Sequence, residues 1–124
     1  MNIEALECML ASGKDGALLR FGLGKGWLDA GNPVRAATHL GRCVVLDPQY
    51  SAAWKLLGKA WLASGQPQAA REAWQRGLSV AGSKGDQQAR KEMQVFLRRL
   101  DREQAARRRR AESISPRWPM PVRT

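Results

Sequence analysis

The sequence has few of the residues on which several classes of protein depend. Of its 124 residues, two are cysteines, Cys8 and Cys43, and one is a histidine, His39. Two cysteines are too few for the disulfide framework of a small secreted domain, which favours a reducing compartment. Cys43 falls at a small-residue position of a helical pattern, so packing is its expected role.

Arrangements that carry catalysis or metal binding are equally scarce. General acid–base work needs a placed partner and a metal site needs several ligands, but the segment around His39 offers neither at an evident spacing. We expect His39 to be an ordinary residue on a helix surface. The glycine-rich stretch 22–26 is not a phosphate-binding loop, because no strand precedes it and no Ser or Thr follows Lys25. The sequence therefore predicts no enzyme, no cofactor and no metal site.

Long hydrophobic runs are also missing. No stretch approaches the roughly 20 apolar residues that span a bilayer. The N-terminus reads Met1-Asn2-Ile3-Glu4, with acidic residues where a signal peptide has basic ones. We expect a soluble, cytoplasmic protein that does not insert into membranes.

Acidic residues are few in the last third of the chain. The formal net charge is +10, of which residues 1–83 carry +3 and residues 84–124 carry +7. The first two thirds are nearly balanced, so any attraction to polyanions concerns the C-terminal part.

What the sequence does contain is an internal repeat of 34 residues. Shifted by that length without a gap, Leu23-Gly24-Lys25 falls on Leu57-Gly58-Lys59 and Trp27-Leu28 falls on Trp61-Leu62. Gly31, Pro33 and Ala36 likewise fall on Gly65, Pro67 and Ala70. Such self-similarity at a fixed period indicates a repeat architecture.

Each unit reads as two helices joined by a turn. Apolar residues recur at helical spacing in residues 51–64, where Ser51 suits the N-cap, and again after Pro67. Gly65 tolerates the left-handed backbone of a helix end, and Pro67 fits the first turn of the next helix. In the first unit, Asp15 is the expected cap of a helix running to Ala30, and a second helix closes at Asp47-Pro48.

This spacing resembles the tetratricopeptide repeat. The second unit matches its pattern with Trp54, Leu57, Gly58, Trp61, Ala70, Trp74 and Gly77, followed by Gly82 where proline is usual. The first unit matches with Leu23, Gly24, Trp27, Ala36, Leu40, Cys43 and Pro48, and has Arg20 at the opening aromatic position. The resemblance covers residues 17–84. It implies an all-α, right-handed solenoid of antiparallel helix hairpins, with the four tryptophans Trp27, Trp54, Trp61 and Trp74 in the core.

Two repeats need helices at both ends to cover their apolar faces. We expect about six helices in a domain of residues 1–100, with repeats 17–50 and 51–84 and flanking helices 2–12 and 86–100. Between them, residues 82–85 read as a loop, and Asp86 is the expected cap of the last helix. Residues 101–112 read as a basic helical extension and residues 113–124, with Pro116, as a disordered tail.

The resemblance also implies a binding surface, because proteins of this family hold peptides or partner helices in a groove lined by the first helix of each repeat. The corresponding residues are Leu18, Phe21, Lys25, Leu28, Asp29, Ala52, Lys55, Lys59 and Leu62. Lys55 and Lys59 are one helical turn apart, so both ammonium groups point the same way. Together with the apolar Leu18 and Phe21, they favour a partner that carries acidic and apolar groups. The alternative that these lysines only solvate an exposed helix face stays open.

The C-terminal arginines have several interpretations. They are Arg98, Arg99, Arg102, Arg107, Arg108, Arg109 and Arg110. The run Arg107–Arg110 solvates a helix end in the favoured interpretation, and the arginines contact nucleic acid by releasing counterions in the second. Contact with anionic lipid is a third interpretation, but no large apolar face accompanies the run. A self-associating scaffold is a further alternative for the whole protein, and the sequence leaves the partner and the oligomeric state open.

Overall fold

A computed structural model describes residues 2–114 of the chain. Over this range the structure contains α-helices only. They are α1 (Ile3–Ala11), α2 (Ala17–Asp29), α3 (Pro33–Leu46), α4 (Ser51–Ala63), α5 (Pro67–Lys84) and α6 (Gln87–Ile114). The predicted all-α fold and the number of helices are confirmed for the described part of the chain.

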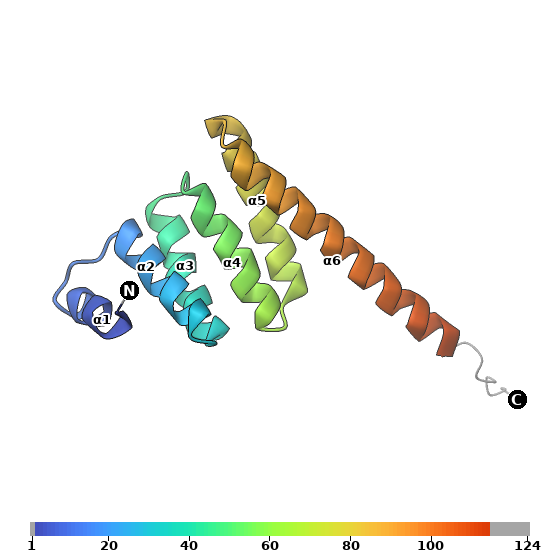
Figure 1. Cartoon of the computed structure of the whole chain (residues 1–124), viewed down its shortest axis with the longest axis horizontal. Helices are drawn as coiled ribbons and strands as arrows, with labels where there is room; N and C mark the ends of the chain where they lie inside the picture. The colour runs from blue at the N-terminus through green and yellow to red at the C-terminus, as the bar shows by residue number, and fades with distance from the viewer. Residues whose placement is uncertain (1, 115–124) are drawn as a thin grey trace, which may run out of the picture.

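The helices form stacked antiparallel hairpins (Figure 1). The most extensive contacts are between α2 and α3 and between α4 and α5, which are the two predicted repeats. α4 also packs on α3, and α6 packs on α5 and α4, so that each hairpin is covered by the next helix in the chain. α1 lies against α2 at the other end.

The turn inside each repeat follows from its glycine and proline. Gly31 and Gly65, which are 34 residues apart, have positive φ angles of 83° and 79°. Pro33 and Pro67 then begin the second helices, where the missing N–H costs nothing. The two turns therefore have the same construction, as the repeat predicts.

The repeat glycines allow the two helices of each hairpin to approach closely. A Cβ atom on Gly24 would lie 2.3 Å from the Leu40 side chain, and one on Gly58 would lie 2.1 Å from the Trp74 ring. The facing side chains are fully or almost fully buried. Trp54 and Trp74 lie in the core as predicted, whereas Trp27 and Trp61 are half-buried at its edge.

The helix boundaries differ from the prediction at the C-terminal end. Gly82 and Ser83 were expected in a loop but belong to α5, which ends at Gly85 in the left-handed conformation. α6 then runs without a break from Gln87 to Ile114, so the flanking helix 86–100 and the basic extension 101–112 are one helix. Residues 113–114 of the expected tail also belong to α6, and residues 115–124 lie outside the described residues.

Two of the predicted caps are wrong. Gly16, not Asp15, is the N-cap of α2, and Tyr50, not Ser51, is the N-cap of α4. Asp86 does cap α6, since the amide of Ala89 donates to its Oδ1 at 3.2 Å. Ser51 donates to the other oxygen of Asp86 at 2.7 Å and thereby joins the start of α4 to the start of α6. This hydrogen bond lowers the pKa of the Asp86 carboxyl.

Candidate functional site

The predicted groove residues lie on α2 and α4, the first helices of the two repeats. Leu18, Lys25, Asp29, Lys59 and Leu62 are exposed, and Phe21, Leu28, Ala52 and Lys55 are half-buried. They do not line a single groove. Most of them line three hollows, two of which adjoin along α2, and each is completed by residues of α1 or α6.

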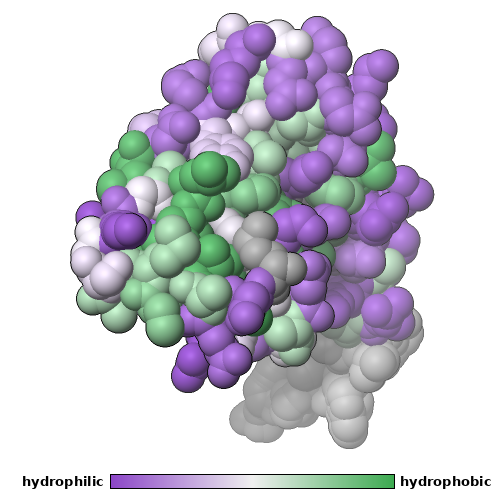
Figure 2. Space-filling model, turned by 60° about the vertical axis from the view of Figure 1, so that its left-hand side comes forward, coloured by the Kyte–Doolittle hydropathy of each residue, from purple (hydrophilic) through white to green (hydrophobic). Residues whose placement is uncertain are grey.

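The largest of these, the apolar hollow, has a volume of about 600 Å³. It is lined by Leu6, Met9, Leu18, Leu19, Phe21, Gly22 and Tyr50, from α1, α2 and the start of α4. Leu18 is 75% exposed and Met9 44% exposed. Figure 2 shows the apolar area at this end of the molecule, bordered by hydrophilic side chains.

A stacked aromatic pair forms one wall of the apolar hollow. The rings of Phe21 and Tyr50 have centroids 4.8 Å apart and planes 21° apart. Phe21 comes from α2 and Tyr50 from the N-cap of α4, so the pair joins the two repeats. Because both rings are held by the fold, the wall is largely preformed for a ligand.

A polar cluster holds α1 in place at the edge of this hollow. Trp27 donates through its Nε1 to Glu7 Oε2 at 3.1 Å, and the same oxygen lies 3.7 Å from His39 Nε2. Arg20 Nη1 lies 3.1 Å from His39 Nδ1, and the Arg20 guanidinium also pairs with Asp15. Glu7 thus ties α1 to both helices of the first repeat.

His39 is therefore not the surface residue that was expected. Only 9% of it is exposed, and burial lowers its pKa despite the nearby Glu7 carboxylate. Arg20, which occupies an aromatic position of the repeat pattern, supplies its hydrogen-bonding partner. The arginine holds the pKa of Asp15 below its usual range.

A second hollow continues the first along α2. It has a volume of about 430 Å³, is lined by Ile3, Gly22, Lys25, Gly26 and Asp29, and shares Gly22 with the apolar hollow. Lys25 Nζ lies 3.7 Å from Asp29 Oδ2, one turn further along the helix. The two hollows together follow most of α2, with an apolar end at Leu18 and a charged end at Asp29.

The third hollow lies between α4 and α6 and has a volume of about 340 Å³. Lys59 and Leu62 line it together with Phe96, Arg99 and other residues of α6 and α5. The Lys59 ammonium lies 5.2 Å above the centre of the Phe96 ring, within the range of a cation–π contact.

The three predicted groove lysines do not act as one cluster. Lys55 donates to Glu92 Oε1 at 2.7 Å, which lowers the pKa of that carboxyl, and so joins α4 to α6. Lys25 faces Asp29, and Lys59 covers Phe96. Leu28 packs against a cluster of buried residues from α3, α4 and α5, which includes Leu40, Trp54 and Leu57 and which we call the first core cluster.

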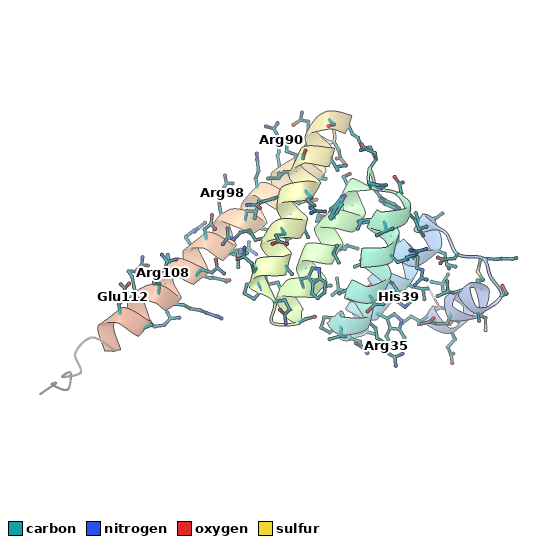
Figure 3. All side chains as sticks on the ribbon, turned by 180° about the vertical axis from the view of Figure 1, so that it is seen from behind. Arg35, His39, Arg90, Arg98, Arg108 and Glu112 are labelled. Carbon is teal, nitrogen blue, oxygen red and sulfur yellow. The ribbon has the colours of Figure 1, made fainter. Side chains whose placement is uncertain are left out.

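The predicted arginines are all exposed on α6. Figure 3 shows the side chain of Arg98 extending away from the body of the repeats, and Arg108 lying on the part of α6 that projects beyond it. Arg99 instead lines the third hollow, and Arg107 lines a smaller one beside Leu62 and Gly65.

Two negative observations apply to the described residues. No helix among residues 2–114 has the length and apolar content needed to cross a bilayer. In the same range, no three His, Cys, Asp or Glu side chains come together in a way that would hold a metal ion.

Comparisons with known proteins agree with this architecture. The family model described as tetratricopeptide repeat matches residues 28–91. A TPR repeat-containing protein of Pseudomonas aeruginosa is 66% identical over 102 residues, which are 82% of this chain and 97% of that protein.

Two solved structures are similar to this fold. The solution structure of a protein from Bordetella parapertussis is 50% identical, with a TM-score of 0.75 over 86% of this chain and 92% of that one. The crystal structure of MamA has a TM-score of 0.59 at 20% identity, over 86% of this chain and 69% of that one, and is similar in fold alone.

Proposed function

The chain belongs to the tetratricopeptide repeat family, and on this premise we propose that it binds a short peptide or partner helix along α2 and α4. Proteins of this family generally act as interaction modules rather than as catalysts. In the proposal the protein acts as an adaptor in the cytoplasm. Its two unpaired cysteines, exposed Cys8 and buried Cys43, are compatible with a reducing compartment.

The observation that carries the proposal is the apolar hollow beside Leu18. A leucine that is 75% exposed, above a stacked aromatic pair and next to Met9, leaves apolar surface in water that a partner can cover. Burial of apolar surface stabilises a complex by roughly 25 cal/mol per Å² before the costs of association. Contiguous patches of this kind mark interaction sites more often than isolated exposed leucines do.

The chemistry of the surface indicates the chemistry of the partner. An apolar side chain of the partner fits the hollow at Phe21, and an acidic group fits further along α2 near Lys25 or at Lys59. Lys55 contributes less, because its ammonium already pairs with Glu92. The partner in this proposal is therefore chiefly apolar, with acidic groups in a secondary role.

The first test replaces Leu18 by Glu. Partners enriched on the immobilised wild-type chain are identified by mass spectrometry, and the binding of the main partner is then measured with purified proteins. We expect Leu18→Glu to weaken this binding by 10-fold or more, on the order of 1.4 kcal/mol, because a carboxylate replaces the apolar contact. The matched control is Val34→Glu on α3, which is also a large aliphatic side chain and is 65% exposed. If Leu18→Glu and Val34→Glu bound the partner equally well, the apolar hollow would not be part of the binding surface.

The second test concerns the lysines. Reversal at Lys55 would place a second carboxylate beside Glu92 and disturb the contact between α4 and α6, so we use Lys25→Glu/Lys59→Glu instead. The control is Lys14→Glu/Arg76→Glu, which changes the net charge equally at other exposed positions. Unchanged binding by the first pair would contradict the role of acidic groups in the partner, while the apolar contact would stand.

A further inference from the structure

A straight row of basic side chains lies on the outward face of α6. Lys91, Arg98, Arg102 and Arg109 are separated by seven, four and seven residues. At 3.6 residues per turn, Arg98, Arg102 and Arg109 lie within about 20° of Lys91 around the helix axis. All four side chains are exposed. We call these four residues the basic ridge.

The ridge points directly away from the packed face of the helix. Ala89, Met93 and Leu100 are buried against α5 and α4, and they lie about half a turn around the helix from the ridge. In Figure 3 the side chain of Arg98, a ridge residue, extends away from the helical body. The ridge is therefore open along its whole length in the described structure.

Acidic side chains of α6 lie off the ridge and are largely engaged elsewhere. Glu92 pairs with Lys55 of α4, and Asp101 pairs with Arg71 of α5. Glu103 lines the third hollow on the α4 side. On the same side of the helix, the positions between the ridge residues hold uncharged residues, namely Gln94, Val95, Ala105 and Ala106. Glu112, three residues after Arg109, is the one acidic residue of α6 that lies near the ridge, so the helix opposes the positive charge of the ridge only at its C-terminal end.

The shape and chemistry of the ridge favour one class of partner. From Lys91 to Arg109 the ridge is about 27 Å long at 1.5 Å per residue, and it is rigid because α6 is continuous. It has no aromatic side chain, so it lacks the base stacking on which single-strand binding depends. It also lacks the large apolar side chains that bury a helix in a membrane interface. What remains is a line of cations that suits the regularly spaced phosphates of a duplex.

We propose that the basic ridge binds the phosphate backbone of double-stranded nucleic acid, without sequence specificity. This activity is independent of the partner surface on α2 and α4, because none of the four ridge residues lines its hollows. The interaction is electrostatic, so each neutralised phosphate releases counterions and the affinity falls steeply with salt. With about four contacts, the slope of log K against log salt is about −3.6, or roughly a 100-fold loss between about 50 and 200 mM salt.

The experiment measures binding of the full chain to a short DNA duplex of mixed sequence by fluorescence anisotropy across a salt series. The ridge variant is Arg98→Gln/Arg102→Gln/Arg109→Gln, and we expect it to bind at least 10-fold more weakly at low salt and to have a slope shallower by about 3. The control Lys14→Gln/Arg42→Gln/Arg76→Gln removes the same charge from exposed positions outside α6 and keeps most of the binding and the slope. Circular dichroism verifies that both variants are folded.

Three further measurements distinguish duplex binding by the ridge from a general attraction of the basic helix to single strands or to anionic membranes. Arg107→Gln/Arg108→Gln/Arg110→Gln removes three arginines of α6 that lie about 100° or more around the helix from the ridge, and the proposal expects a smaller loss than the ridge variant shows. A single strand of the same sequence is expected to bind more weakly than the duplex. Equal losses in the ridge variant and the Lys14 control, or a larger loss in the Arg107 variant, would overturn the proposal. Binding to phosphatidylserine vesicles with no binding to the duplex would overturn it as well.

Discussion

At the scale of single residues, Gly58 determines how closely α4 and α5 pack. A Cβ at this position would lie 2.1 Å from Trp74 Nε1, which donates to the Lys55 carbonyl at 3.0 Å. We predict that Gly58→Ala destabilises the fold by about 1–3 kcal/mol through overpacking, measured by urea unfolding.

The control for this prediction is Gly82→Ala. Gly82 lies inside α5, is exposed, and has no atom within 4 Å of an added Cβ. Alanine is the better helix former, so this variant is expected to gain about 0.5–1 kcal/mol. If Gly58→Ala stabilised the fold as Gly82→Ala does, helix propensity and not packing would dominate at Gly58.

A second prediction at this scale concerns His39. Because burial lowers its pKa in the folded state, the unfolded state binds more protons below the unfolded value of about 6.5. The free energy of unfolding should therefore fall as pH drops from about 7.5 to 5.5, the range above the titration of ordinary carboxyls. The charged groups that face His39 are Glu7, Arg20, Arg35 and Asp15.

The measurement compares urea midpoints of the wild type and His39→Gln at both pH values. Glutamine accepts from Arg20 and donates towards Glu7, as the neutral imidazole does, but it does not titrate. The variant should lose most of the pH dependence. If the wild type and the variant showed the same pH dependence of stability, other titrating groups would be its cause.

His39 also illustrates what the sequence does not reveal at this scale. Its helical position was readable, but its burial depends on α1, whose Glu7 lies more than thirty residues earlier in the chain and faces its ring. Arg20 likewise looked like a departure from the repeat pattern, and its pairing with Asp15 and His39 is a tertiary contact. Glu7 and Asp15 both lie outside the first repeat, so the 34-residue period does not report their contacts with His39 and Arg20.

At the scale of elements, α6 consists of two stretches with different roles. Its residues from Ala89 to Leu100 bury Met93 and other side chains against the second repeat, whereas Arg107 to Glu112 are all exposed. The helix is continuous, so its length alone does not report this division. The sequence does indicate this division, because the apolar residues at helical spacing stop at Leu100.

Truncation tests this division. A chain ending at Ala106 should keep its stability to within about 0.5 kcal/mol, since Arg107 to Glu112 are all exposed. A chain ending at Asp86 should be largely unfolded, because it exposes Trp74 and loses Met93 and Leu100, each of which contributes about 1.5–3 kcal/mol by burial. Far-UV circular dichroism and urea unfolding measure both; a stable shorter chain would contradict the role of α6 as a cover.

At the scale of the whole molecule, the two repeats share their core. The half-buried Trp61 packs against the first core cluster and also against a second cluster of buried residues, which includes Trp74 and Met93. Ser51 and Lys55 join the second repeat to α6. We predict one cooperative transition, with tryptophan fluorescence and circular dichroism giving the same midpoint in urea. Separate midpoints would mean that the hairpins unfold independently, as units of longer repeat arrays can.

The fold was largely predictable at this scale, but the candidate site was less so. The 34-residue period was enough for the two hairpins, their turns and their close-packed glycines. It did not place α1, and so Leu6, Met9 and Tyr50 were missed as lining residues of the apolar hollow. Lys55 was predicted on an open face, and its pairing with Glu92 depends on how α6 packs against α4.

The outward face of α6 also determines where this array can lengthen. α6 packs on α4 and α5 as α4 packs on α2 and α3, and it therefore stands where the first helix of a third repeat would stand. A further hairpin added after it would have to cover Lys91, Arg98 and Arg102, and burial of unpaired cations costs several kcal/mol each. A duplicated copy of residues 51–84 inserted before Ser51 would instead meet apolar surfaces like those it already contacts. Growth of the repeat by gene duplication is thus expected in the middle of the chain and not at its C-terminal end.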